Sequence, residues 1–198
     1  MDVHRGWERS GPREPLGARR RSVRVKLTAL AAIAASLTAL TGAAHPASAG
    51  AASHPIGAVE TCLTQSGAGF PHAFTNRENL VTGPLALIGA GQLTPAATVR
   101  EFGGNKFPLL VAAGHTVTIA VVGSTATLTY GDHSRTGHRV MTFRACRRRD
   151  AASTADGKPV TFWSGSVNVS QPGCVPLRIW VDRERRPRSA HIALGRRC

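Results

Sequence analysis

Two segments of the chain alternate between apolar and polar positions. The apolar positions are Val117, Ile119 and Val121 within residues 115–122, and Val175, Leu177, Ile179 and Val181 within residues 174–182. Successive side chains of a β-strand point to opposite faces, so a period of two is typical of a strand with one buried face. Both segments are therefore predicted to be β-strands.

Eight further segments carry weaker strand patterns. They are 80–88, 98–102, 109–112, 126–130, 139–145, 160–163, 166–170 and 191–194. Turn-forming combinations of Gly, Pro, Asn and Asp separate most of them. After residue 49, no segment keeps the 3.6-residue apolar period of a helix over three turns. The sequence predicts an all-β fold, an antiparallel β-sandwich of immunoglobulin-like or jelly-roll-like type, with a β-barrel as the alternative.

The first 49 residues have the order of regions found in export signals. Residues 1–26 hold eight basic residues and three acids, residues 27–42 carry no charge, and Ala47-Ser48-Ala49 matches a signal-peptidase site. A membrane anchor, the alternative, would need about 20 strongly apolar residues. We predict a signal peptide at 1–49 with cleavage after Ala49, a flexible tail at 50–58 and a single β-sandwich domain at 59–198.

The four cysteines agree with export. Cys62, Cys146, Cys174 and Cys198 lie in the predicted mature chain, are widely spaced and form no C-x-x-C motif. This usage is typical of disulfides in an oxidising compartment rather than of zinc or redox chemistry. The protein is therefore expected to be secreted or associated with the cell envelope. Three pairings are possible, and we prefer Cys146–Cys174 with Cys62–Cys198, which would join the ends of the domain.

Positive charge is the strongest feature that the fold itself does not require. The chain has a net charge of +14, and its predicted mature part keeps 17 basic against 8 acidic residues. Two clusters stand out, Arg147, Arg148 and Arg149, and Arg183, Arg185, Arg186 and Arg188. If the strands alternate in direction without crossing, both clusters lie at the same end of the domain. The same alternation separates Cys146 from Cys174, against the preferred disulfide.

Such an Arg-rich edge could contact an anionic cell-envelope polymer or another protein. A solvated surface, rich in arginine through coding bias, is the simpler interpretation. Nucleic acid is disfavoured as a partner because the arginines are not interleaved with stacking aromatic residues. Contact with a membrane is expected only through an uncleaved leader.

The segment 131–138 places Asp132, His133 and His138 in one predicted hairpin loop. Imidazole and carboxylate groups suit zinc or copper, which makes these three residues weak candidate ligands. Arg135 and Arg139 would repel a cation, and a polar turn is the alternative. We therefore predict neither a metal nor another cofactor.

Signatures of known enzyme classes are missing. The chain contains no G-x-S-x-G, S-x-x-K, H-E-x-x-H or G-x-x-x-x-G-K motif. No catalytic residue is predicted, and an exported hydrolase of unrecognised type is the alternative to a binding protein. A pocket that gathers Asp132, His133 or His138 with another acid would favour the hydrolase.

Three runs carry a resemblance to other proteins. They are Val140-Met141-Thr142-Phe143-Arg144-Ala145-Cys146, Val167-Asn168-Val169 with Pro172-Gly173-Cys174-Val175-Pro176-Leu177, and the C-terminal Gly195 to Cys198. In these runs the chain resembles uncharacterised small secreted proteins of high-GC Gram-positive bacteria, over about its last 120 residues. The resemblance implies a compact secreted β domain and transfers no catalytic residue. We expect a secreted, non-catalytic binding or cell-envelope-associated protein.

Overall fold

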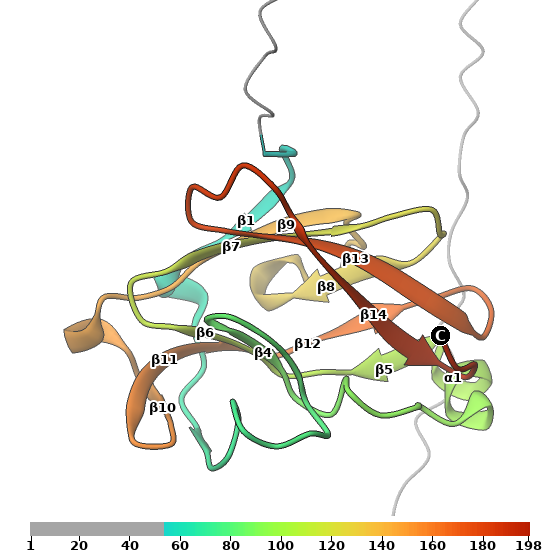
Figure 1. The fold of residues 1–198 in the computed structure, drawn as a ribbon, viewed down its shortest axis with the longest axis horizontal. Coiled ribbons are helices and arrows are strands. Elements are labelled where there is room, and N and C mark those ends of the chain that lie inside the picture. The colour runs from blue at the N-terminus through green and yellow to red at the C-terminus, as the bar shows by residue number, and fades with distance from the viewer. Residues whose placement is uncertain (1–53) are drawn as a thin grey trace, which may run out of the picture. The chain divides into compact units, whose positions relative to one another are not determined.

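The computed structural model describes residues 54–198, drawn as a ribbon in Figure 1. The predicted signal peptide, residues 1–49, lies outside the described residues, as do residues 50–53 of the predicted tail. The described part holds fourteen strands, one α-helix and three 3-10 helices. The prediction of a mostly β domain is confirmed. Within residues 54–198, no helix is both long and apolar enough to cross a membrane.

Sheet A contains both segments of strict alternation. Its spatial order is β1 (Ala58–Glu60), β9 (Val140–Arg144), β7 (Thr116–Val121), β13 (Gly173–Val181) and β14 (Arg188–Leu194). In β7 and β13, Ile119 lies opposite Ile179 and both are buried. The neighbouring strands are antiparallel except β1, which runs parallel to β9 at one edge.

Sheet B has six strands, in the order β2 (Gly69–Phe70), β10 (Ser153–Ala155), β11 (Lys158–Trp163), β6 (Leu109–Ala112), β4 (Leu85–Leu87) and β3 (Leu80–Thr82). The segment 80–88, predicted as one strand, forms the β3–β4 hairpin instead. The chain reverses at Gly83, whose φ of 57° lies in the left-handed region that glycine adopts without a steric penalty. Pairing in this sheet is antiparallel except between β2 and β10.

Sheet C is the smallest sheet and consists of β5 (Gly104–Lys106), β12 (Gly165–Asn168) and β8 (Thr127–Tyr130). Leu128 is paired with Val167, and both side chains are buried in the core. The next pair, Thr129 and Ser166, therefore projects from the opposite face. This outer face has hydroxyl and amide side chains on neighbouring strands.

The prediction of a strand at 98–102 is wrong, because this segment belongs to the helix α1 (Ala96–Phe102). Pro95 precedes the helix, where the fixed φ of proline suits a helix start. Gly103 ends it with a φ of 67°, and its N–H donates to the carbonyl of Val99. Val99 is the one buried residue of these two turns, so the segment has no apolar period from which a helix can be predicted.

One hydrophobic core is shared by the three sheets. It includes Leu85 and Leu109 of sheet B, Ile119 and Phe143 of sheet A, and Leu128 of sheet C. The rings of Tyr130 and Trp163 both pack on Phe143, with centroids 5.4 and 5.3 Å away. The Tyr130 hydroxyl donates to the carbonyl of Phe107, and burial raises the pKa of this phenol. A second, smaller cluster covers the other face of sheet B: Ala73, Ala86, Leu110, Ala155 and Val160.

Two disulfides are present, as predicted, but the preferred pairing is wrong. The bonds join Cys62 to Cys146 and Cys174 to Cys198. The reason is strand direction. Cys62 and Cys146 follow the parallel neighbours β1 and β9, whereas Cys174 lies at the start of β13 and Cys198 follows its antiparallel neighbour β14. Each bond therefore closes one end of sheet A, and Cys146 and Cys174 lie at opposite ends.

The first described residues pack against sheet A. His54 Nε2 hydrogen-bonds to the carbonyl of Glu184 at 2.8 Å, and its ring centroid lies 6.1 Å from that of Trp180. Trp180 is 9% exposed. Ala58, the last residue of the predicted tail, begins β1. The segment before β1 therefore helps to cover the outer face of β13.

Candidate functional site

The strand register brings the two arginine clusters to one end of sheet A. β9 and β13 both run antiparallel to β7, which lies between them, so their C-terminal ends lie on the same side. Arg144 is paired with Thr116, and the N–H of Asp182 donates to the carbonyl of Thr116. The clusters follow directly after these ends. We call the exposed set the Arg-rich end: Arg147, Arg148, Arg149, Arg183, Arg185, Arg186 and Arg188.

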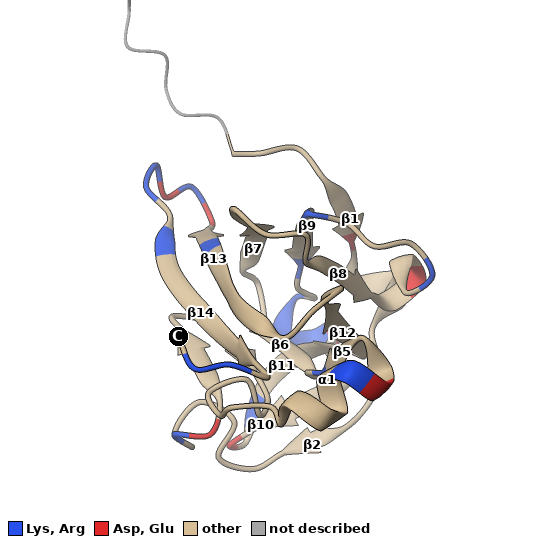
Figure 2. Cartoon of the chain, turned by 90° about the vertical axis from the view of Figure 1, so that its right-hand side faces the viewer, with Lys and Arg blue, Asp and Glu red and all other residues tan. Residues whose placement is uncertain are grey.

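Acidic neighbours compensate only part of this charge. Arg149 lies 3.5 Å from Asp150, and Arg188 forms a 2.5 Å ion pair with Glu184. Figure 2 shows the alternation of basic and acidic residues along the β13–β14 hairpin. Within residues 54–198, the other five arginines of the Arg-rich end form no ion pair: Arg147, Arg148, Arg183, Arg185 and Arg186. Their guanidinium groups can bind an anion bidentately.

A histidine and an aspartate lie between the two clusters. His115 Nδ1 is 2.8 Å from Oδ2 of Asp182, and the N–H of Thr116 donates to Oδ1 at 2.9 Å. Burial acts to raise the pKa of Asp182, but the hydrogen bonds from Thr116 and His115 outweigh it and leave the pKa below its usual value. Asp182 has a φ of 50°, and these contacts hold the backbone where β13 turns toward the hairpin.

The loop that carries His133 and His138 is held in place by Glu60, a residue that no sequence pattern indicates. Glu60, at the end of β1, is fully buried. Its Oε1 accepts hydrogen bonds from the backbone N–H and the ring Nδ1 of His133 in the 3-10 helix Gly131–His133, and its Oε2 accepts from the Thr64 hydroxyl. Thr64 in turn accepts from the indole N–H of Trp163. Because its oxygens are held by two loops, Glu60 anchors both.

The three weak candidate metal ligands do not converge on one point. The rings of His133 and His138 meet edge to face at 5.2 Å, and Nε2 of His138 is buried without a hydrogen-bond partner in the described chain. His133 uses Nδ1 to bind Glu60, and Asp132 is exposed. Among residues 54–198, no group of three or more His, Cys, Asp or Glu side chains is placed to hold a metal ion.

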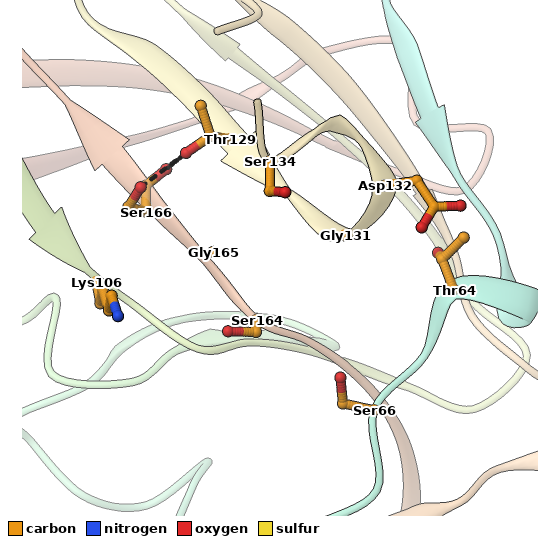
Figure 3. Close-up of a pocket in the computed structure, with 10 residues that line it drawn as sticks. All are labelled: Thr64, Ser66, Lys106, Thr129, Gly131, Asp132, Ser134, Ser164, Gly165 and Ser166. Carbon is orange, nitrogen blue, oxygen red and sulfur yellow. Dashed lines mark hydrogen bonds between the residues drawn. The ribbon is translucent and has the colours of Figure 1, made fainter. Parts of the chain in front are cut away.

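A groove with one mainly polar and one mainly apolar part lies on the outer face of sheet C. Two adjoining hollows, with volumes of about 480 and 500 Å³, share Lys106 and Ser166. Figure 3 shows the first hollow, in which hydroxyl side chains lie between Lys106 on one side and Asp132 on the other. The second hollow extends to Phe102 at the end of α1. We call the two hollows together the sheet C groove.

Three side chains in the middle of the sheet C groove form a closed hydrogen-bonded ring. The hydroxyls of Thr129 and Ser166 are 2.7 Å apart, Ser166 Oγ donates to Oδ1 of Asn168 at 3.1 Å, and Nδ2 of Asn168 donates to Thr129 Oγ1 at 3.0 Å. Ser166 and Asn168 are two positions apart on β12, and Thr129 is the register partner of Ser166. They therefore share one face of the sheet.

The sheet C groove does not gather the acid and histidine set that would favour a hydrolase. Asp132 is its one acidic residue, while Glu60, His133 and His138 lie outside its lining. The sequence does not indicate Lys106, Thr129, Ser166 and Asn168 as site residues, because their positions converge only through strand pairing. The alternation of Leu128 with Thr129, and of Val167 with Ser166, was the one available signal.

No protein-family model, curated protein or solved structure matches this chain.

Proposed function

We propose that the protein is a secreted, non-catalytic binding protein of the cell envelope, whose Arg-rich end contacts anionic polymers. In this proposal a signal peptide directs export, and the three sheets form a disulfide-stabilised β-sandwich. The proposed ligand is a polymer that carries phosphate or carboxylate groups. It assigns no reaction to the chain.

The observation that carries the proposal is the position of the two arginine clusters beyond the C-terminal ends of β9 and β13. Residues 147–150 hold three arginines and one acid, and residues 182–188 hold four arginines and two acids. The two segments together carry seven arginines against three acids, a net charge of +4 at one end of a sheet. Multiple charge contacts on one surface suit a repeating anion better than a single small one, because each repeat adds a contact.

The location outside the cytoplasm is supported by two further features. Both disulfides close within residues 54–198 and leave no free cysteine there, and disulfides persist in oxidising compartments. The first 49 residues also have the composition of an export signal.

The experiment is a binding measurement with long-chain polyphosphate and with teichoic acid at about 50 and 500 mM salt. We expect the affinity to fall steeply between the two conditions, because bound arginines displace condensed counterions from a polyanion. Changing Arg147, Arg148 and Arg149 to Gln should weaken binding by at least about tenfold at low salt. The matched control changes three exposed arginines elsewhere to Gln: Arg77, Arg100 and Arg135.

Binding that is insensitive to salt, or equal losses in the two triple variants, would contradict the proposal. Double-stranded DNA is included as a competitor. If DNA binds with the higher affinity in every condition, the anionic partner is a nucleic acid and not an envelope polymer.

The alternative, an exported hydrolase, has one observation in its favour. The Nδ1 of His133 is held by the buried Glu60 carboxylate next to a loop whose Asp132 and Ser134 line the sheet C groove. A carboxylate that orients an imidazole is a recurring arrangement in hydrolases. Hydrolysis of ester, glycoside or phosphoester substrates that is lost in His133→Gln and retained in His191→Gln would establish this alternative.

A further inference from the structure

The ring of Thr129, Ser166 and Asn168 restricts what can bind above it. Ser166 donates its hydroxyl proton to Asn168, so the short contact between the two hydroxyls has Thr129 as donor. Asn168 then donates one N–H to Thr129. Both hydroxyl protons are used within the ring. The groups that can still hydrogen-bond to a ligand are lone pairs on the two hydroxyl oxygens and the second N–H of Asn168.

The ring also fixes the three side chains before any ligand arrives. Each of them would otherwise lose rotamer freedom on binding, at a cost that weakens affinity. Ser166 is paired with Lys106 on β5 and with Thr129 on β8, so the ring is attached to the central strand of sheet C. A rigid β-sheet therefore presents acceptors and one amide donor in a fixed pattern.

Lys106 complements the ring. Its side chain is exposed, lines both hollows and makes no hydrogen bond or ion pair within residues 54–198. The ammonium group supplies up to three donors beside the acceptors of Thr129 and Ser166. A ligand group that meets both must donate and accept hydrogen bonds, and an alcohol hydroxyl does both.

The second hollow adds an apolar surface. Phe102 is 69% exposed at the end of α1 and lines this hollow together with Asn168. Gly104 lies between them, and a Cβ at that position would collide with the backbone of Val167 and Asn168. Glycine at this position allows β5 to approach β12 closely. An aromatic face beside a row of amide and hydroxyl groups suits a ring that is apolar on one face and hydroxylated at its edge.

The sheet C groove and the Arg-rich end differ in their net charge. Lys106 and Asp132 are the charged residues of the sheet C groove and have opposite signs. The groove therefore has no surplus charge to attract a polyanion. Each hollow has a volume within the range of about 300–1,000 Å³ that is usual for ligand pockets, and Lys106 and Ser166 line both of them.

We propose that the sheet C groove binds a neutral oligosaccharide chain. Sugar hydroxyls donate to Thr129 and Ser166 and accept from Lys106 and Asn168, and one pyranose ring packs on Phe102. This site goes beyond the proposed binding of anionic polymers, since it lies on another sheet and recognises a different chemistry.

The test is calorimetric titration of the purified protein with hexasaccharides of glucose, mannose, xylose and N-acetylglucosamine, at about 1 M salt. Charge-driven binding at the Arg-rich end is strongly screened in this condition. We expect saturable binding of at least one sugar with a Kd below about 1 mM. Lys106→Ala and Phe102→Ala should each weaken it by about tenfold or more, and exposure of both side chains leaves folding unaffected.

The matched controls are Lys158→Ala and Ile56→Ala, which remove an exposed lysine and an exposed apolar side chain that do not line the groove. Both should bind like the unchanged protein. Ser166→Ala, checked for its fold by near-ultraviolet circular dichroism, should lose binding because it opens the ring. The proposal is overturned if none of the four sugars binds, or if the controls weaken binding as much as Lys106→Ala and Phe102→Ala do.

Sugar binding at the sheet C groove and polyphosphate binding at the Arg-rich end can be tested independently. The triple change of Arg147, Arg148 and Arg149 to Gln should leave sugar binding unchanged and weaken polyphosphate binding. Sugar binding that disappears in this triple variant would overturn the assignment to sheet C, whatever the outcome with polyphosphate.

Discussion

Glu60 accepts two hydrogen bonds from His133, one from the backbone N–H at 3.1 Å and one from ring Nδ1 at 2.7 Å. The two residues are 73 positions apart in sequence, and the carboxylate is fully buried. Its other oxygen accepts from Thr64. One side chain therefore links the end of β1, the 3-10 helix Cys62–Thr64 and the loop that carries both candidate histidines.

Replacing Glu60 with Ala should lower the free energy of unfolding by about 2 kcal/mol, because the two His133 donors lose their acceptor at a cost of about 1 kcal/mol each, while the Thr64 hydroxyl keeps the carbonyl of Thr61 as acceptor. Urea unfolding measures this change. Glu60→Gln should lose less, since an amide oxygen still accepts from His133. Glu78→Ala, an exposed control, should lie within about 0.5 kcal/mol of the unchanged protein. Equal stability of Glu60→Ala and Glu78→Ala would refute the anchoring role.

Asp182→Asn should reduce stability in a pH-dependent way. The pKa of Asp182 is lowered in the folded protein, so its carboxylate stabilises the fold above the unfolded pKa of about 3.9, and this contribution is lost as the pH falls through the lowered folded pKa. The difference from the unchanged protein should be below about 1 kcal/mol at pH 6, because the site is partly exposed, and should shrink as the pH falls below the unfolded pKa of about 3.9. Urea unfolding across this range measures it.

A control for this variant isolates the contribution of the His115 side chain. Asp156 also has a positive φ, 51°, and its Oδ1 also accepts from a backbone N–H, that of His72, so Asp156→Asn makes the same change without an imidazole partner. A stability difference for Asp182→Asn that stays constant from pH 6 to pH 2 would contradict the electrostatic explanation.

Removal of the two disulfides should have unequal effects. The Cys62–Cys146 bond closes a separation of 84 residues and the Cys174–Cys198 bond one of 24. In the chain-entropy account the first contributes about 4.5 kcal/mol and the second about 3.5 kcal/mol. The Cys62→Ser, Cys146→Ser variant should thus unfold at lower urea than the Cys174→Ser, Cys198→Ser variant. The reverse order would show that native-state contacts outweigh loop closure.

Gly165→Ala should lower the free energy of unfolding by about 2 kcal/mol. A Cβ at this position would collide with the Tyr130 ring and the Thr129 carbonyl, and neither can move far inside the core. Gly69→Ala is the matched control, since Gly69 also lies in a strand and has no atom within 4 Å of the added Cβ. Thermal unfolding that shifts equally in both variants would contradict the close packing of β12 on β8.

Sequence alternation predicted β7 and β13 because their apolar positions face the core, although Thr118, Ala120 and Trp180 on the other face are buried as well. The same logic failed for α1, where Val99 alone is buried and two turns are too short to show a period. The disulfides illustrate another limit. Cysteine spacing indicated two bonds, but their partners depend on β1 running parallel to β9, and no local pattern encodes that pairing.

The site residues were predictable to different degrees. Runs of arginine are visible in the sequence, whereas Glu60 looks like any other acid until its contact with His133 is known. The ring of Thr129, Ser166 and Asn168 needs the register of two strands 37 residues apart. Serine, threonine and asparagine are common in turns and surface strands, so their identity alone indicates no site.

The short strand β1 also affects how the molecules behave toward each other. Ala58–Glu60 covers β9, a strand of five residues in a core sheet, and Glu60 and the Cys62–Cys146 bond hold it there. Without β1, the unpaired backbone groups of β9 would form an open edge that invites pairing with a second copy. Detachment of these three residues is therefore a route to aggregation, and the bonds that secure them protect solubility.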